Sequence, residues 1–251
     1  MKKLFAMLLA VLMVAGLVAC GETAAPAGTT ATPTTATGDA TEATNGTEVA
    51  LMTYEEFMAA EVDAAVCIET YVQATRAWWN NTICVYAQGP DGGYFMYDMA
   101  CSEEDAAKLT PGTKIRVTGD KAIYDGEVEI MNGTFTFVEG ADTYVAEAMD
   151  ATELLGTEEL EKHMNKLASF KGLTIKKVEY KNGAPGDDIY VTVAKGENEY
   201  SFCVEMYLTG VDSDVYKTVG TLAEGDVVDV EGFLYWYKGV NTHITAIAKA
   251  A

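Results

Sequence analysis

The chain of 251 residues carries one pattern of residues twice. Five positions in its middle recur 113 residues later, with strand-like residues in register between them. The pairs are Leu109 and Leu222, Gly112 and Gly225, Gly119 and Gly232, Tyr124 and Tyr237, and Gly126 and Gly239. A shared offset over leucine, glycine and tyrosine indicates a duplicated folding unit of about 100 residues, enough to bury its own core. Two copies are too few for a solenoid.

Valine, isoleucine, tyrosine and phenylalanine alternate through both copies with the period of a β-strand. In the first copy we expect strands at 66–72, 82–88, 94–99, 114–124 and 127–130. A helix-like segment precedes each copy. Residues 53–61 begin with the capping-box pair Thr53 and Glu56. Residues 157–168 place three apolar side chains at helical spacing, Leu160, Met164 and Leu167.

The order of these elements predicts the fold class. Each copy has a long strand, two strands joined by a turn, a short helix or loop at 102–109 or 211–222, and a final hairpin. That order matches the OB-fold, a five-stranded, partly open Greek-key barrel. We predict a mainly β protein with two tandem OB-fold-like five-stranded barrels, repeat 1 at 51–150 and repeat 2 at 151–251. A β-sandwich is the alternative.

The N-terminus has the pattern of a secretion signal. Lys2 and Lys3 precede an apolar run that ends Leu17-Val18-Ala19-Cys20, followed by Gly21. This run resembles the lipobox of a bacterial lipoprotein. The resemblance implies a signal peptide at 1–19, cleavage before Cys20 and lipidation of its thiol; an uncleaved anchor is the alternative. Residues 20–50 are rich in Thr, Ala and Pro, so we expect a disordered linker after the lipidated cysteine.

Taken together, these features resemble uncharacterised bacterial lipoproteins with tandem OB-fold-like domains. The resemblance rests on the lipobox, on Tyr94-Phe95-Met96-Tyr97 and on the stretch 109–115. It implies a lipid-anchored protein at the extracytoplasmic face of the cell membrane, held in the bilayer by the acyl group on Cys20. It implies no activity.

The net charge limits the classes of partner that we expect, and the cysteine count limits the possible disulfides. The net charge is −21, and it becomes more negative if Lys2 and Lys3 are removed with the leader. Nucleic-acid binding rests on clustered Lys and Arg, so this acidity disfavours it. Four cysteines follow Cys20; we favour buried free thiols, with one disulfide inside repeat 1 as the alternative. They are Cys67, Cys84, Cys101 and Cys203.

Aromatic residues in the loops are the candidate ligand site. OB-folds bind ligands at the loops joining strands 1–2 and 4–5, here 76–81 and 124–127 in repeat 1. We expect Trp78, Trp79 and Tyr124 to cluster at one mouth of the barrel, unless the tryptophans pack in the core. Tyr94 and Tyr97 are expected on opposite faces of one strand. The full candidate set is Trp78, Trp79, Tyr94, Tyr97, Tyr124, Trp236 and Tyr237.

Catalysis has little support in the sequence. His163 and His243 are far apart, and no hydrolase, zinc or Walker motif occurs. The acidic row Asp125, Glu127 and Glu129 does not supply the wrapped oxygen ligands that calcium needs. We expect no catalytic residue, no metal and no cofactor, and therefore no enzyme.

These inferences lead to one expected function. We expect a non-enzymatic binding or adaptor role at the cell envelope, with a glycan, a peptide or another protein as ligand. A purely structural spacer or assembly subunit is the alternative. An envelope hydrolase and a single-stranded nucleic-acid binder are less favoured, and nucleic acid is disfavoured as a partner.

Overall fold

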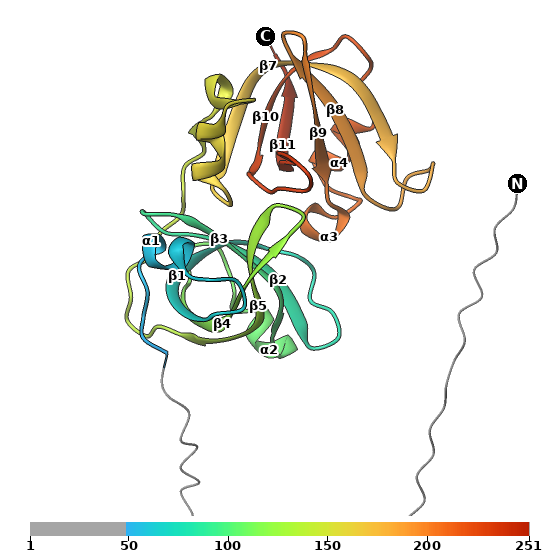
Figure 1. Ribbon diagram of the computed structural model, residues 1–251. Coiled ribbons are helices and arrows are strands. Elements are labelled where there is room, and N and C mark those ends of the chain that lie inside the picture. The colour runs from blue at the N-terminus through green and yellow to red at the C-terminus, as the bar shows by residue number, and fades with distance from the viewer. Residues whose placement is uncertain (1–48, 251) are drawn as a thin grey trace, which may run out of the picture. The chain divides into compact units, whose positions relative to one another are not determined.

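The computed structural model describes residues 49–250, and β-strands form most of their regular structure (Figure 1). The signal peptide at 1–19, Cys20 and all but the end of the 20–50 linker lie outside the described residues. No helix within 49–250 is long and apolar enough to cross a membrane. The boundaries between the two repeats stay a prediction.

Repeat 1 folds into a closed barrel with the strand order β1-β2-β3-β5-β4. Its pairs are antiparallel except β3 with β5, which run parallel. Alternating apolar residues point inward, and the core includes Ile68, Val85, Met96 and Ile115. The five-stranded barrel predicted for this repeat is confirmed. Its strands are β1 (Ala65–Thr75), β2 (Thr82–Gln88), β3 (Gly93–Ala100), β4 (Lys114–Tyr124) and β5 (Glu127–Phe137).

Two short helices complete repeat 1. Helix α1 (Tyr54–Ala59) begins at Thr53, whose side chain and that of Glu56 form the capping box expected from the sequence. Phe57 of this helix is buried against the barrel. Helix α2 (Glu103–Ala106) lies between β3 and β4, where an OB-fold carries its connecting helix.

Repeat 2 forms a second sheet with the order β10-β11-β9-β8-β7-β6, and an additional pairing of β10 with β7 closes a ring of five strands. The ring order, β7-β8-β9-β11-β10, is that of repeat 1, and β9 pairs in parallel with β11. Helices α3 (Met206–Thr209) and α4 (Asp214–Val219) lie between β9 and β10. The strands are β6 (Met149–Asp150), β7 (Leu167–Tyr180), β8 (Ile189–Lys195), β9 (Asn198–Val204), β10 (Val227–Phe233) and β11 (His243–Lys249).

The amphipathic helix expected at 157–168 is wrong. The segment before β7 contains two 3₁₀ helices, η1 (Thr152–Leu154) and η2 (Glu158–His163). Asn165 has a left-handed φ of 65°, which ends the helical turn. Leu167, the third apolar position of the pattern, is the first residue of β7 and pairs with Phe233. The last apolar residue of the helix-like pattern therefore belongs to strand β7, where it pairs with β10.

Gly119 and Gly232, which are equivalent in the duplication, occupy equivalent places in the fold. The register of β4 against β5 shifts between Thr118 and Asp120. A Cβ on Gly119 would lie 2.6 Å from Cγ2 of Ile130, and one on Gly232 would lie 2.3 Å from the carbonyl oxygen of His243. Both glycines therefore allow a close approach of backbone where the barrel strand bends.

The two repeats also share an apolar contact. Cys84, Tyr86 and Phe95 of repeat 1 pack against Phe233 and Tyr235 of repeat 2. The rings of Tyr86 and Phe233 stack with centroids 4.7 Å apart. The four cysteines of the described region are free and buried, so the alternative of a disulfide in repeat 1 is not formed.

Candidate functional site

A groove of about 590 Å³ lies where the first loop of repeat 1 meets helix α3 of repeat 2. It is lined by Arg76, Ala77, Trp79, Asn80, Thr82, Ile83, Cys84, Tyr97, Asp98 and Tyr207. Its three aromatic residues are exposed: Trp79 is 79%, Tyr207 55% and Tyr97 37% accessible. Exposed aromatic side chains that line one groove offer π-faces to a planar ligand.

A tight hairpin turn holds Trp79 at the groove. The backbones of Trp79 and Thr82 exchange two hydrogen bonds, of 3.1 and 2.9 Å. The two residues between them, Asn80 and Asn81, have φ of 50° and 62°. Two successive left-handed residues make the turn type preferred in two-residue hairpins, and asparagine tolerates it. The turn thereby fixes the backbone of Trp79 beside the groove and leaves its ring exposed.

A β-bulge in β3 turns two neighbouring side chains toward the groove. Met96 pairs with Val85 and Met99 pairs with Ile83, so two residues of β3 oppose the single residue Cys84 of β2. The two are Tyr97 and Asp98, and both are exposed. In a regular strand they would face opposite sides. The bulge explains why both line the same groove.

Tyr207 comes from repeat 2 and is placed by polar contacts with repeat 1. The backbone N–H of Ala77 donates to the carbonyl oxygen of Tyr207 at 2.7 Å. Nε of Arg76 lies 3.2 Å from Oε2 of Glu205, the residue that precedes helix α3. The groove therefore depends on both repeats.

Arg76 belongs to a buried polar chain behind the groove. Its Nη2 donates to the hydroxyl of Tyr86 at 3.3 Å, and that hydroxyl lies 2.6 Å from Nδ1 of His243. Complete burial and the charge of Arg76 hold the pKa of His243 well below its ordinary value, so its ring is neutral. The Tyr86 hydroxyl accepts from Arg76 and shares a second hydrogen bond with Nδ1 of His243. The guanidinium charge is balanced by Glu205, and it is the only Lys or Arg side chain among the groove residues.

The other predicted aromatic residues are placed elsewhere. Trp78 is partly buried, and its indole N–H donates to the carbonyl oxygen of Cys101 at 2.8 Å. Tyr94 is buried beside Tyr54, whose ring it meets edge-on. Trp236 is buried in the core of repeat 2. These three side chains stabilise the barrels and do not line the groove.

Tyr124 and Tyr237 form a second exposed aromatic feature. Their rings stack with centroids 6.1 Å apart and an interplanar angle of 30°. Because Tyr124 stacks on Tyr237 and Trp78 is tied to Cys101, the cluster expected from Trp78, Trp79 and Tyr124 does not form. Nζ of the loop residue Lys238 lies 4.9 Å from the Tyr237 ring centroid and 4.0 Å from Oδ2 of Asp125.

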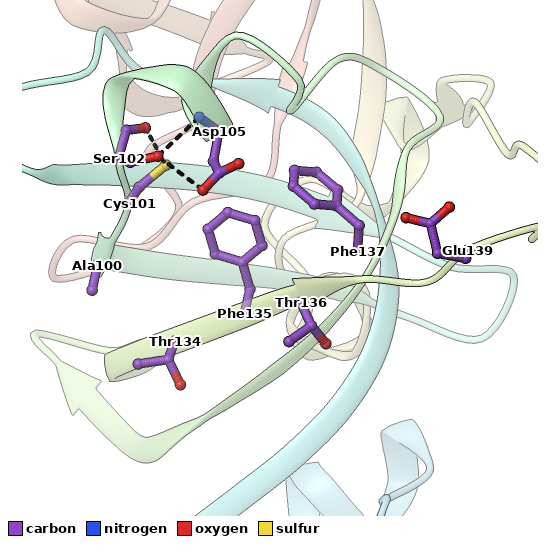
Figure 2. A pocket seen from close by; sticks show the side chains of 9 residues that line it. All are labelled: Ala100, Cys101, Ser102, Asp105, Thr134, Phe135, Thr136, Phe137 and Glu139. Carbon is purple, nitrogen blue, oxygen red and sulfur yellow. Dashed lines mark hydrogen bonds between the residues drawn. The ribbon is translucent and has the colours of Figure 1, made fainter.

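A cavity of about 560 Å³ in repeat 1 is shown in Figure 2. Phe135 and Phe137 meet edge-to-face at its wall. The Ser102 hydroxyl accepts from the backbone N–H of Asp105 and donates to its carboxylate, as a helix cap does. Because these polar groups serve α2, we place the candidate site at the aromatic groove. In the described part of the chain, no three His, Cys, Asp or Glu residues gather as a metal site would require.

Sequence reasoning missed Asp98 and Tyr207 as site residues. Asp98 reaches the groove because of a bulge set by strand pairing, which a period-2 pattern does not reveal. Tyr207 belongs to a connection between strands, far in sequence from Trp79. Tyr97 carried a usable signal, since strand parity placed it opposite the buried Tyr94.

No protein-family model matches the sequence, and no curated protein sequence matches it. Solved structures do. A murine DNA binding protein bound with dsDNA is similar over 74% of this chain and 96% of that chain, with 11% identity and a TM-score of 0.37. The Ifi202 HINa domain in complex with 20-bp dsDNA is similar over 72% and 94%, with 11% identity and a TM-score of 0.34. A replication protein A heterotrimer bound to ssDNA is similar over 74% and 48%, with 13% identity and a TM-score of 0.28.

The expectation that nucleic acid is a less favoured ligand than a glycan, a peptide or a protein, and an unlikely partner, is contradicted. The similar structures are described with dsDNA or ssDNA. The expectation rested on the net charge of the whole chain, which does not describe the chemistry of one groove. At such low identity, the likeness concerns the fold alone: a β structure with HIN and OB-like neighbours.

Proposed function

We propose that the groove binds single-stranded nucleic acid by stacking its bases on Trp79, Tyr97 and Tyr207. The observation that carries this proposal is the exposure of three aromatic side chains along one groove. Every nucleobase has a π-face, and an unpaired strand presents it. A duplex keeps its bases stacked within the helix, so the proposal concerns single strands.

Stacking supplies enough free energy for this role. Base–aromatic stacking is worth about 1–3 kcal/mol per base, so two or three stacked bases account for a useful affinity. Phosphate contacts contribute little, because Arg76 is paired with Glu205 and the chain is acidic overall. The proposed binding is thus driven by the bases and not by the backbone.

We extend the proposal to location and chemistry. The lipobox-like run ending at Cys20 supports a lipid anchor that holds this domain outside the cytoplasm, where its ligand would be extracellular nucleic acid. The proposed role is binding without catalysis: the groove's one thiol, Cys84, is buried and its pKa is raised to about 11, so it stays protonated and is a poor nucleophile.

The experiment uses the full chain in detergent and dye-labelled 12-nucleotide single strands in fluorescence anisotropy titrations. We expect saturable binding, weakened about 5- to 100-fold by Trp79→Ala and by Tyr207→Ala, from the stacking free energy. Tyr237→Ala is the matched control, because this exposed tyrosine stacks on Tyr124 away from the groove. The proposal is overturned if no single strand binds, or if Trp79→Ala binds as the unaltered protein does.

A further inference from the structure

We infer that Asp98 makes the groove prefer bases with an exocyclic amino group, with cytosine favoured over thymine. This inference rests on the proposed function and adds to it a base preference. It is carried by the placement of Asp98, which is the carboxylate among the groove residues.

The backbone holds Asp98 in an unusual conformation. Its φ is 45°, in the left-handed region that residues with a Cβ seldom adopt, and it lies in the bulge opposite Cys84. A regular strand would turn this side chain away from the face that carries Tyr97. Residues in this region cluster at functional sites, and aspartate tolerates it better than most residues do. The bulge places the carboxylate next to the aromatic ring of its neighbour.

Two hydrogen bonds to one thiol fix the position of Asp98. The backbone N–H of Asp98 donates to Sγ of Cys84 at 3.4 Å, and that thiol donates to Oδ1 of Asp98 at 3.5 Å. Burial raises the pKa of Cys84 to about 11, so the sulfur keeps the proton that it donates. An ionised carboxylate can accept about four hydrogen bonds. One bond from the thiol therefore leaves Asp98 able to accept from a ligand.

A carboxylate accepts hydrogen bonds and does not donate them, which decides the bases it favours. Cytosine offers its N4 amino group, the known partner of Asp and Glu side chains. Thymine and uracil carry a carbonyl oxygen at the equivalent position, which repels a carboxylate. The one ring N–H donor of thymine and uracil lies between two carbonyl oxygens, so a carboxylate that approaches it is also repelled. Stacking on Trp79 and Tyr97 holds the base edge near Asp98 but does not distinguish the two pyrimidines.

Arg76 does not give the groove a preference for guanine that would compete with a preference for cytosine. A free guanidinium at the groove would favour guanine through O6 and N7. Here Arg76 is held by Glu205 at 3.2 Å and by the hydroxyl of Tyr86 at 3.3 Å. Besides Asp98, the groove thus carries a committed cation, a thiol, aromatic rings and the uncharged polar side chains of Asn80 and Thr82.

The test compares oligodeoxycytidine and oligothymidine of 12 nucleotides, which have the same length, charge and ring size. We expect the full chain to bind the cytidine strand about 10-fold more tightly, as one hydrogen bond to a charged group implies. In Asp98→Asn, the amide both donates and accepts, so the ratio of the two affinities should fall to near 1. Asparagine also tolerates the left-handed φ, so the bulge is kept.

Asp125→Asn is the matched control, since Asp125 is an exposed aspartate with φ of 48° in the loop after Tyr124. It should leave the ratio unchanged. Equal binding of the two strands by the unaltered protein overturns the base preference while single-strand binding stands. A preference kept in Asp98→Asn overturns the role of Asp98. Binding of neither strand overturns the proposed function itself.

Discussion

The Tyr86 hydroxyl lies 2.6 Å from Nδ1 of His243, across 157 positions of sequence, and so ties repeat 1 to repeat 2. Both side chains are buried. Tyr86→Phe would leave Nδ1 of His243 without its hydrogen-bond partner, and a buried polar group without a partner costs about 1–3 kcal/mol. We expect the free energy of unfolding to fall by that amount in urea titrations. Tyr124→Phe, at an exposed tyrosine, should change it little; an equal loss in both variants would argue against the buried bond.

Because Arg76 and Glu205 form an ion pair, we expect the losses of stability caused by substituting each of them to be non-additive. Glu205 is 9% exposed in its side chain, so Arg76→Met leaves a buried carboxylate without its cation, at a cost of about 3–5 kcal/mol. Arg76→Met with Glu205→Leu removes both charges and should restore much of the stability. Urea unfolding of the single and double variants measures the coupling. Lys162→Met, in the exposed pair with Glu159, is the control and should cost under about 1 kcal/mol. Additive losses for Arg76 and Glu205 would contradict this.

The raised pKa of Glu127 predicts a loss of stability as the pH rises from about 4.5 toward 8. Its Oε2 accepts from the backbone N–H of Trp236 at 2.7 Å, and burial raises its pKa to about 8 from 4.5. The folded protein therefore keeps a proton that the unfolded chain loses above pH 4.5. The stabilisation is complete below that pH and is lost as the pH rises toward 8, by up to about 5 kcal/mol.

Glu127→Gln isolates this effect, because the amide oxygen can still accept from Trp236 and carries no ionisable proton. We expect the stability of the unaltered protein relative to Glu127→Gln to fall between pH 5 and pH 9 in urea titrations. Glu139→Gln, at an exposed carboxylate, is the control. A constant difference between the unaltered protein and Glu127→Gln across this range would show that Glu127 titrates normally.

Gly119 predicts a steric penalty at the bend of β4. A Cβ there would lie 2.6 Å from Cγ2 of Ile130 and 2.7 Å from the carbonyl oxygen of Met131. Overpacking of this kind costs about 1–3 kcal/mol, so Gly119→Ala should lower the melting temperature by several degrees. Gly89→Ala is the control, since no atom lies within 4 Å of its added Cβ. Equal melting temperatures for Gly119→Ala and the unaltered protein would contradict the close approach.

The barrel of repeat 1 was predictable because its signals are local. Period-2 alternation located β2 and β4, and Thr53 with Glu56 located the start of α1. The groove was not predictable from the sequence, because it is formed by strand pairing and by contacts between the two repeats. Nothing local distinguishes Trp78 from Trp79; the first is fixed by the carbonyl of Cys101 and the second is left exposed.

The same reasoning explains the failure over 157–168. Leu160 and Met164 are buried as a helical face would be, but Leu167 is taken by the pairing of β7 with β10. A tertiary pairing thus overrides a local pattern of three apolar residues. The prediction from net charge, that nucleic acid is disfavoured as a ligand, was wrong for a different reason. A net charge summed over the chain does not say where the charged side chains lie.

Binding through bases predicts a weak dependence on salt. For a single strand, the slope of log K against log salt is about −0.7 per phosphate neutralised. The groove contains one cation, Arg76, already paired with Glu205, so we expect a slope of magnitude below about 1. Anisotropy titrations of a 12-nucleotide strand from 50 to 500 mM salt measure it. Trp79→Ala should lower the affinity at every salt concentration without changing the slope. A steep slope would show that phosphate contacts outside this groove carry the binding.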